Sequence, residues 1–291
     1  MLVLVAQPPG QALVGAGIIV LLVIALAIRI ATTDDEQARA DARLHASQYF
    51  QGACKNVGND DNEVVRAGGF YALGMIWRDW PDEHQRVLDY VQAWLQKHAV
   101  GDDSDSSGRG NAGRPDMDVA AALGELLNRP TRPERRPIDL ARCSFVGFDL
   151  RAANLPGAVL TKIDLTRARL ADAVLNGVDL DDAALVEADL SRANLAGAML
   201  RNARLERANL TGADLSGANL QRAGLVAAKL AGVNFAGANL LGARLEHADL
   251  RETTGLTAAQ LKTAELDPNT RLPADIDRDE VTGPRVRRQS F

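Results

Sequence analysis

A strict five-residue repeat runs through the second half of the sequence and constrains the fold more than any other feature. Leu or Phe occupies every fifth position from Leu140 to Leu250, and only Phe145 and Phe235 depart from Leu. Two residues before each of these positions stands Ala or another apolar residue, beginning with Ile138. The other positions of each unit are mostly small, polar or charged. The pattern therefore predicts a chain that buries the same two positions in every unit.

This spacing excludes both a long helix and a flat strand. In an α-helix, five residues advance a side chain by about 500°, so the leucines would spiral over every face. In a straight strand, residues five apart alternate between the two faces. The backbone must instead turn once in each unit. The chain then stacks into a coil, with hydrogen bonds between successive turns that lie about 4.8 Å apart.

The spacing of glycines indicates how many units make one turn of the coil. Five glycines recur at every fourth unit, each two positions after a central Leu or Phe: Gly157, Gly177, Gly197, Gly217 and Gly237. Four units per turn would align them on one face, together with a column of amide and carboxylate side chains: Asn154, Asn194, Asp214 and Asn234. Val174 interrupts the column, and stacked amides in such a column can hydrogen-bond to one another. Two interpretations stay open, a turn that needs a positive φ and a dedicated contact surface.

The repeated ANLxx and ADLxx units resemble the pentapeptide-repeat family over residues 138–252. The resemblance implies a right-handed quadrilateral β-helix and no catalytic residues. The stretch VRAGGFYALGMIWRDWPDEHQRV is similar to a helical segment that precedes the repeats in membrane-attached bacterial members. Those members tend to have Ser before the proline, whereas this chain has Trp80 before Pro81, so the side-chain N-cap is expected to be lost.

The predicted fold is mainly β, a pentapeptide-repeat solenoid preceded by a transmembrane helix and a small α-helical region. Residues 62–79 and 81–99 are expected to form an antiparallel helix pair, with Gly68 and Gly69 allowing close approach. Thr257 and Gln260 form a capping-box pattern. The expected organisation is an N-terminal segment with the membrane helix, 1–31; a stalk and helical region, 32–100; a flexible linker, 101–115; a short helix and N-terminal cap, 116–137; the β-helix, 138–252; a helical C-terminal cap, 253–275; and a disordered tail, 276–291.

The N-terminal sequence predicts contact with a lipid bilayer through residues 12–30. No charged side chain precedes Arg29, and the apolar run is about 17 residues, the lower limit for a membrane-spanning helix. A cleaved signal peptide competes, but the leader has no Lys or Arg for its first region. Positive charge follows the run at Arg29, Arg39 and Arg43. We therefore expect a single-pass protein of the bacterial cytoplasmic membrane with its C-terminal domain in the cytoplasm.

The sequence predicts no enzyme, cofactor or metal site. Cys54 and Cys143 are far apart and belong to no CxxC pair, and no histidine stands at metal-ligand spacing. We expect His84 and His98 to be solvated or to lie at helix ends, and the three tryptophans to pack between helices. No serine or cysteine nucleophile is paired with a base in the repeats, where His247 is expected to point outward and Cys143 inward.

Charge decides between two kinds of interaction. The family includes mimics of DNA that bind gyrase, which would require a strongly acidic coil. From residue 138 to 250 there are 13 acidic and 12 basic side chains, so the net charge is only -1. Only a local acidic patch stands out, made of Asp179, Asp181, Asp182, Glu187 and Asp189. Asp179, Asp181 and Asp182 of this patch are a second candidate interaction surface. With no basic excess in the chain as a whole, nucleic acid is not the expected partner either.

These features together predict a membrane-anchored, non-catalytic scaffold or protein-interaction module that presents a β-helix surface. The alternative is a DNA-mimic regulator of DNA gyrase. The sequence names no protein partner, and a homodimer is left open as one form of assembly.

Overall fold

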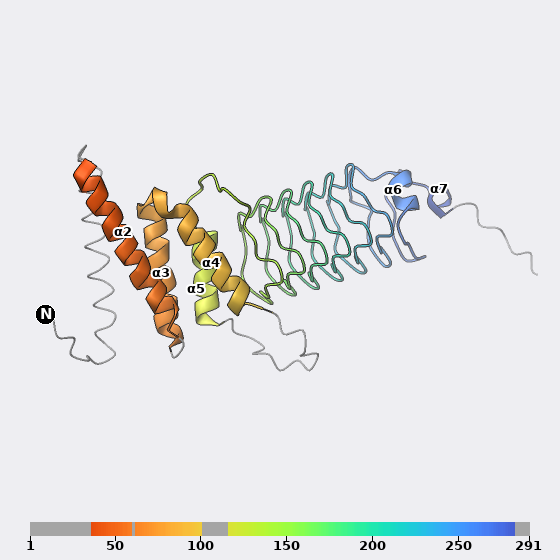
Figure 1. The fold of residues 1–291 in the computed structure, drawn as a ribbon. Coiled ribbons are helices and arrows are strands. Elements are labelled where there is room, and N and C mark those ends of the chain that lie inside the picture. Colours follow the sequence, from red (N-terminus) through yellow and green to blue (C-terminus); the bar gives the residue numbers. More distant parts are fainter. Residues whose placement is uncertain (1–35, 60–61, 101–115, 283–291) are drawn as a thin grey trace, which may run out of the picture.

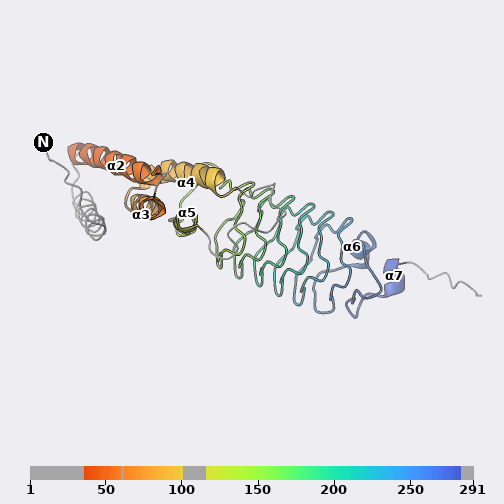
Figure 2. The ribbon, with the colours of Figure 1, turned by 90° about the horizontal axis from the view of Figure 1, so that it is seen from below.

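The computed structural model describes residues 36–59, 62–100 and 116–282, which form a helical cap followed by a stacked coil (Figure 1). The helices are α2 (Glu36–Val57), α3 (Glu63–Asp79), the short 3-10 helix η1 (Pro81–Glu83), α4 (His84–His98), α5 (Met117–Leu127), α6 (Ala258–Lys262) and α7 (Arg278–Thr282). The coil begins beside α4 and α5 and ends at α6 and α7 (Figures 1 and 2).

The coil has four sides, because wall residues on each side pair with the equivalent residue four repeat units along the chain, with one interruption at Lys229. The parallel bridges run without a break from Asn154 through Val174, Asn194, Asp214 and Asn234 to Thr254. Within the described residues, these are single-residue bridges and not extended strands. Each bridge carries two backbone hydrogen bonds, such as Leu195 N–H to Asp214 C=O at 2.8 Å and Asp214 N–H to Ala193 C=O at 3.0 Å. Four pentapeptides per turn, as the glycine spacing predicted, is confirmed.

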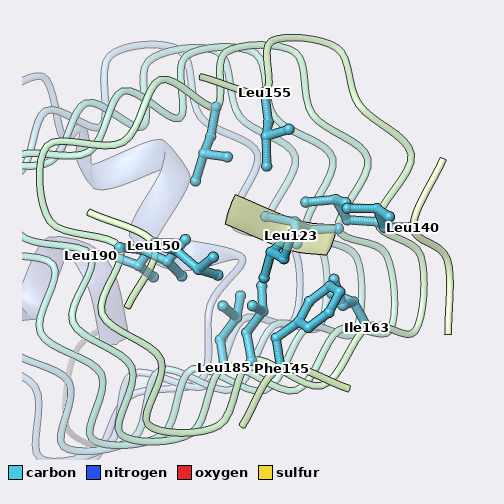
Figure 3. A pocket seen from close by; sticks show the side chains of 13 residues that line it. Leu123, Leu140, Phe145, Leu150, Leu155, Ile163, Leu185 and Leu190 are labelled. Atoms are coloured by element: carbon cyan, nitrogen blue, oxygen red, sulfur yellow. The ribbon is translucent and has the colours of Figure 1, made fainter. Parts of the chain in front are cut away.

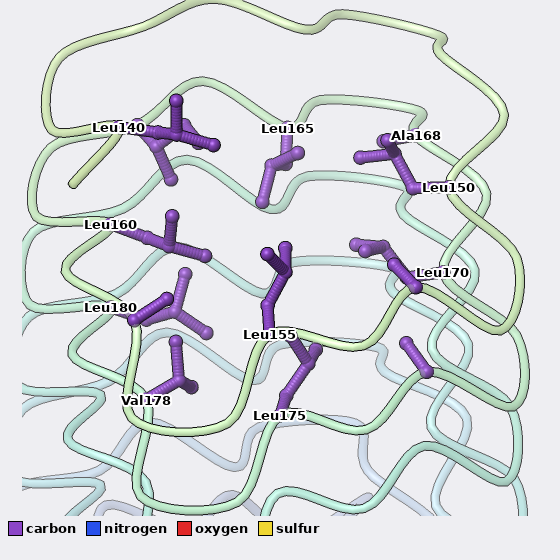
Figure 4. Packing of buried hydrophobic residues seen from close by; sticks show 14 of the residues in the cluster. Leu140, Leu150, Leu155, Leu160, Leu165, Ala168, Leu170, Leu175, Val178 and Leu180 are labelled. Carbon is purple, nitrogen blue, oxygen red and sulfur yellow. The ribbon is translucent and has the colours of Figure 1, made fainter. Parts of the chain in front are cut away.

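The interior is filled by the two apolar positions of each repeat. All central Leu and Phe side chains from Leu140 to Leu250 are at most 4% exposed. The inner Ala positions are equally buried, and Cys143 points inward among them as predicted; Phe148 is only partly buried. Figure 4 shows the leucines in columns, with Leu140, Leu160 and Leu180 above one another. The five-residue period thus becomes a continuous apolar core.

Every corner of the coil uses the same turn. The carbonyl of each central residue accepts a hydrogen bond from the amide three residues on, as in Ala198 N–H to Leu195 C=O at 3.0 Å. The second residue inside the turn has a positive φ at every fifth position from Arg142 to His247. Nine of these 22 positions are Gly and 13 are not, and their φ values lie between 54° and 72°. The left-handed conformation is therefore a property of all four corners, with or without glycine.

The helical cap is two layers deep. Figure 2 shows α2 and α4 in one layer and α3 and α5 in the other, and α3 contacts both α2 and α5. The predicted close approach is confirmed at Gly69, where a Cβ atom would lie 2.7 Å from Val57 Cγ2, but the neighbour is α2 and not the following helix. At Gly68 a Cβ atom would meet no neighbour within 4 Å, so its predicted role is wrong. As expected, Trp80 provides no side-chain cap for η1.

The cap closes the first turn of the coil. Leu123 of α5 projects into the open end among Leu140, Phe145 and Leu155 (Figure 3). The gap left there is apolar and about 10 Å³, room for one water molecule at most, so it is packing space and not a ligand site. Polar contacts join the same parts, because the Gln92 side chain accepts a hydrogen bond from Asp139 N–H.

A short helix closes the other end. The predicted capping box is confirmed, since Thr257 accepts from Gln260 N–H at 3.2 Å and Gln260 accepts from Thr257 N–H at 2.8 Å. The Gln260 amide also donates to Ala238 C=O, which has no wall residue of a further coil to bond to, and to Phe235 C=O. Leu261, on this helix, is fully buried against the last coil. The helix therefore supplies both the apolar cover and the hydrogen bonds that the last turn lacks.

His84 differs from its sequence-based prediction. It is the first residue of α4, so the helix-end position is confirmed, but it is only 5% exposed and is not solvated. Trp77 Nε1 donates a hydrogen bond to His84 Nδ1 at 2.7 Å. Burial, with Arg132 nearby, lowers the pKa of His84 below 6.5, although Glu134 opposes the shift. The three tryptophans are buried in the cap, as predicted.

The predicted single-pass location in the bacterial cytoplasmic membrane is contradicted. Within residues 36–59, 62–100 and 116–282, no helix combines the length and the apolar composition needed to cross a bilayer. The longest, α2, has 22 residues but carries charge at Asp41, Arg43 and Lys55. The predicted span at residues 12–30 lies outside the described residues. The linker at 101–115 does so as well.

Burial of the stacked core leads to a first prediction about stability. Leu200→Ala removes a fully buried side chain and is expected to lower the free energy of unfolding by about 2–5 kcal/mol. Its neighbour Met199 points outward and is 38% exposed, so Met199→Ala is the matched control, with an expected loss of about 0.5 kcal/mol or less. Urea unfolding followed by far-ultraviolet circular dichroism measures both. Equal losses for the two variants would contradict the assigned inside and outside of the wall.

Acidification is expected to weaken the cap selectively. Because folding lowers the pKa of His84, the folded protein resists a proton that the unfolded chain takes up, so stability falls as the pH drops below about 6.5. Protonation would also remove the acceptor for Trp77. Tryptophan fluorescence reports on this region alone, since all three tryptophans lie between residues 77 and 94.

In His84→Asn, the amide oxygen replaces Nδ1 as an acceptor and does not titrate. The fluorescence midpoint in urea should then change less between pH 7 and pH 5.5 than in the native protein. If both proteins show the same pH dependence, another group is responsible.

Candidate interaction surface

The predicted polar column lies on one face of the coil, here called the asparagine face: Asn154, Val174, Asn194, Asp214 and Asn234, joined by consecutive bridges. The side chains have a local structural role, because Asn194 Oδ1 accepts from Ala196 N–H at 3.1 Å and Asp214 Oδ1 accepts from Ser216 N–H at 3.0 Å. A short acceptor at this position therefore holds the start of the turn. One hydrogen bond of the expected stack is present, from Asn234 Nδ2 to Asp214 Oδ1 at 3.0 Å.

This turn-holding role of the acceptors was not predicted from the sequence. The signal was available, because Asn or Asp directly precedes the central Leu or Phe in many repeats on three faces and at Asp164 on the fourth. Asp164, Asp189 and Asn219, which lie on other faces, make the same contact to the amide two residues on. The preference is thus mainly a rule of the turn and does not mark one face.

The corner that follows the asparagine face is occupied by the five glycines at 157, 177, 197, 217 and 237, here called the glycine edge. A Cβ atom added to Gly157, Gly177, Gly197 or Gly217 would meet nothing within 4 Å. Arg, Lys, Asp and Glu take the same positive φ at the other corners, for example at Lys162. Neither the turn nor the space around it therefore requires glycine in all five coils.

Beyond the glycine edge lies a second face, here called the adjoining face: Asp139, Val159, Asp179, Met199, Asn219 and Asn239. The asparagine face, the glycine edge and the adjoining face together contain no Lys or Arg between residues 138 and 250. Their only charged wall residues are Asp139, Asp179 and Asp214. Val174 and Met199 are 37% and 38% exposed, so apolar atoms also reach the surface.

The acidic patch borders the same adjoining face at its other corner. Asp181 is only 8% exposed and forms an ion pair with Arg201 from the next coil. Asp182 Oδ1 accepts from Asn202 Nδ2 at 3.0 Å, and Asp179 Oδ1 accepts from Asp181 N–H at 3.1 Å. The structure thus brings the three carboxylates together, but each already has a partner.

Opposite charges face each other across coils at the two other corners. Arg192 makes two bonds of 2.7 Å to Asp172, and Arg167 Nε lies 2.9 Å from Glu187. These arginines lower the pKa of Asp172 and of Glu187. Such exposed pairs each contribute little stability, but they neutralise the corners. These ion pairs could have been predicted from the sequence, because their two partners are opposite charges separated by four repeat units.

The described residues contain no group of three His, Cys, Asp or Glu side chains arranged to hold a metal ion. The two cysteines are free thiols. Burial raises the pKa of Cys143 to about 12 and also raises that of Cys54, which disfavours the reactive thiolate in both. His247 is exposed as expected and pairs with Asp267 of the C-terminal cap.

Comparison with known proteins supports the fold. The family model described as pentapeptide repeats matches in several copies, at residues 138–172, 188–225, 218–254 and 228–264. The helical cap lies outside these matches. The comparison with curated proteins gives no match.

Three solved structures illustrate the similarity. HetL of the cyanobacterium Nostoc sp. strain PCC 7120, a pentapeptide repeat protein involved in heterocyst differentiation regulation, is 31% identical; the match covers 47% of this chain and 76% of HetL, with a TM-score of 0.29. Rfr23 of the cyanobacterium Cyanothece 51142 is 29% identical, over 45% of this chain and 90% of Rfr23, with a TM-score of 0.30. QnrB1, a plasmid-mediated fluoroquinolone resistance protein, is 22% identical, over 44% of this chain and 67% of that one, with a TM-score of 0.30.

The assignment rests on the repeat matches, which agree with the four-sided coil described above, and on 31% sequence identity over 76% of HetL. Pentapeptide repeats imply a right-handed quadrilateral β-helix. The chain belongs to the pentapeptide-repeat family.

Proposed function

We propose that this protein is a non-catalytic interaction module that docks a partner protein on the glycine edge and the two faces beside it. The observation that carries the proposal is the run of five glycines at one corner of the coil. Because charged residues occupy the equivalent position elsewhere at a φ near 60°, the turn alone does not account for the run. A surface that another backbone approaches closely does account for it.

The composition of the neighbouring faces supports the same use. The centres of protein interfaces are depleted of charged side chains and contain more apolar atoms than the rim. The two faces carry no cation and three carboxylates, and Val174 and Met199 are exposed there. The remaining corners hold ion pairs across coils and resemble an ordinary solvated surface.

The alternative, a DNA mimic that regulates gyrase, has less support. A mimic needs unpaired negative charge at a density near that of a phosphate backbone. Here Asp181 is buried against Arg201, Asp172 is paired with Arg192, and the charges of the repeats nearly cancel. The wall of the coil offers no long acidic stripe.

A pair of arginine substitutions tests the docking surface. Ser216 stands at the glycine edge and Thr166 at the corner two faces away; both are half-buried, and both amides donate to the preceding Asp. Ser216→Arg should place a large charged side chain over the edge and reduce partner recovery about tenfold or more, whereas Thr166→Arg should leave it unchanged. The measurement is crosslinking in cells, followed by quantitative mass spectrometry of proteins recovered with each variant.

Circular dichroism confirms that both variants fold before they are compared. Equal recovery of every crosslinked protein by the two variants would contradict the proposed surface. A second copy of the chain would be recognised as the partner if light scattering shows a dimer that Ser216→Arg alone disrupts. Strong inhibition of gyrase in a supercoiling assay would favour the alternative.

A further inference from the structure

Within the described coil, the ladder is interrupted before its end at Lys229, on the face opposite the adjoining face. Consecutive bridges join Asp149, Arg169, Asp189, Asn209 and Lys229. The next one would join Lys229 to Asp249, but no such bridge forms among the described residues. Pairing resumes with Asp249 and Arg271. The neighbouring faces stay paired at this level, at Gly224 with Arg244 and at Asn234 with Thr254, so the opening is confined to one face.

The opening leaves four main-chain groups without their ladder partners. In the preceding coil, Leu210 N–H bonds to Lys229 C=O and Lys229 N–H bonds to Ala208 C=O, both at 2.9 Å. The equivalent bonds, from Leu230 N–H to Asp249 C=O and from Asp249 N–H to Ala228 C=O, are missing from the described backbone. Two donors and two acceptors therefore face the gap. Such groups are normally paired in a folded protein.

The gap is a cleft of about 320 Å³. Its lining includes both edges of the opened ladder and side chains from the corners: Thr211, Lys229, Leu230, His247, Asp249 and Glu252. This volume is within the range of about 300–1,000 Å³ that is usual for ligand sites. The apolar gap under Leu123, about 10 Å³, is far smaller.

The charges around the cleft are only partly matched. Arg251 bonds to Asp249 at 2.6 Å and 2.9 Å, Arg271 also reaches Asp249, and His247 faces Asp267 at 3.1 Å. Lys229 and Glu252 form no salt bridge within the described residues. The bond to Asp249 is the main cause that raises the pKa of Arg251, and Glu252 lies close enough to add to this rise. One ammonium and one carboxylate without a salt-bridge partner therefore remain beside the main-chain groups that lack ladder partners.

We infer that this cleft binds a short extended peptide that carries both a carboxylate and a cationic side chain. The two coils stay bonded on either side of the cleft, at Ala227 N–H to Glu246 C=O and at Gly232 N–H to Glu252 C=O, so the peptide lies along the face and not between the coils. Its extended main chain alternates donors and acceptors, so some of its groups can bond from the solvent side to the open groups of Leu230 and Asp249. Its carboxylate would meet Lys229 and its cation would meet Glu252. This site lies apart from the glycine edge and does not depend on the proposed function.

Hydrogen exchange of the full chain tests the opening itself. The amides of Leu230 and Asp249 should exchange at least about tenfold faster than those of Leu210 and Lys229, which are bonded in the preceding coil. Equal protection of the two pairs would show that the ladder is closed and would overturn the inference.

Peptide binding tests the occupant. The probe is a pool of end-capped tetrapeptides in which Glu and Lys alternate with Val, titrated against the full chain by calorimetry. Saturable binding should weaken about tenfold or more when the peptide amides are N-methylated, and by a similar factor in Lys229→Glu. Lys162→Glu, an exposed lysine at another corner, and Ser216→Arg are the controls and should bind as the native protein does.

No saturable binding by the pool would overturn the inference. The same holds for binding that N-methylation leaves unchanged, since the main chain would then play no part. Loss of binding in Ser216→Arg but not in Lys229→Glu would assign the peptide to the glycine edge.

Discussion

Burial of each leucine layer by the layers above and below it is the constraint on which the whole structure depends. Leu195 is fully buried because the coils on either side complete its surroundings, and no single turn could achieve this alone. The hydrogen-bonded ladder follows from the same stacking, since the coils must lie in register for Leu195 to reach Asp214. Both ends of such a stack are incomplete, and Leu123 and Leu261 cover the two exposed layers.

The repeated features were predictable because a local rule recurs in each unit. The spacing from Leu140 to Leu250 indicated a coil, and glycines that recur at every fourth unit, such as Gly197 and Gly217, indicated four sides. The capping box that starts the C-terminal helix was equally predictable from Thr257 and Gln260. The asparagine face was located correctly as a column, although the turn-holding role of its side chains was not foreseen.

Features that depend on contacts made only once were not predictable. Nothing near His84 in the sequence indicates that Trp77 bonds to it in a buried site, and the docking of α5 on the first coil likewise has no local signature. The ion pair in the acidic patch could not be predicted for a different reason. Asp181 and Arg201 are separated by one full coil of the chain, so their pairing becomes visible only once the number of sides is known. The opened ladder at Lys229 follows from no repeat rule, because the residues there fit the pattern.

The step of four repeat units between paired wall residues has a consequence for how such a chain can change length. Duplication or loss of one complete coil would return every downstream residue to its own face, leaving the glycine edge straight and the ion pairs between coils matched. Gain or loss of a single repeat would also preserve the apolar core, because each unit buries the same two positions. It would, however, rotate everything beyond it by a quarter turn and divide the glycine edge between two corners. Selection for a stable core alone would tolerate either event, whereas selection for a continuous docking edge would retain only whole coils.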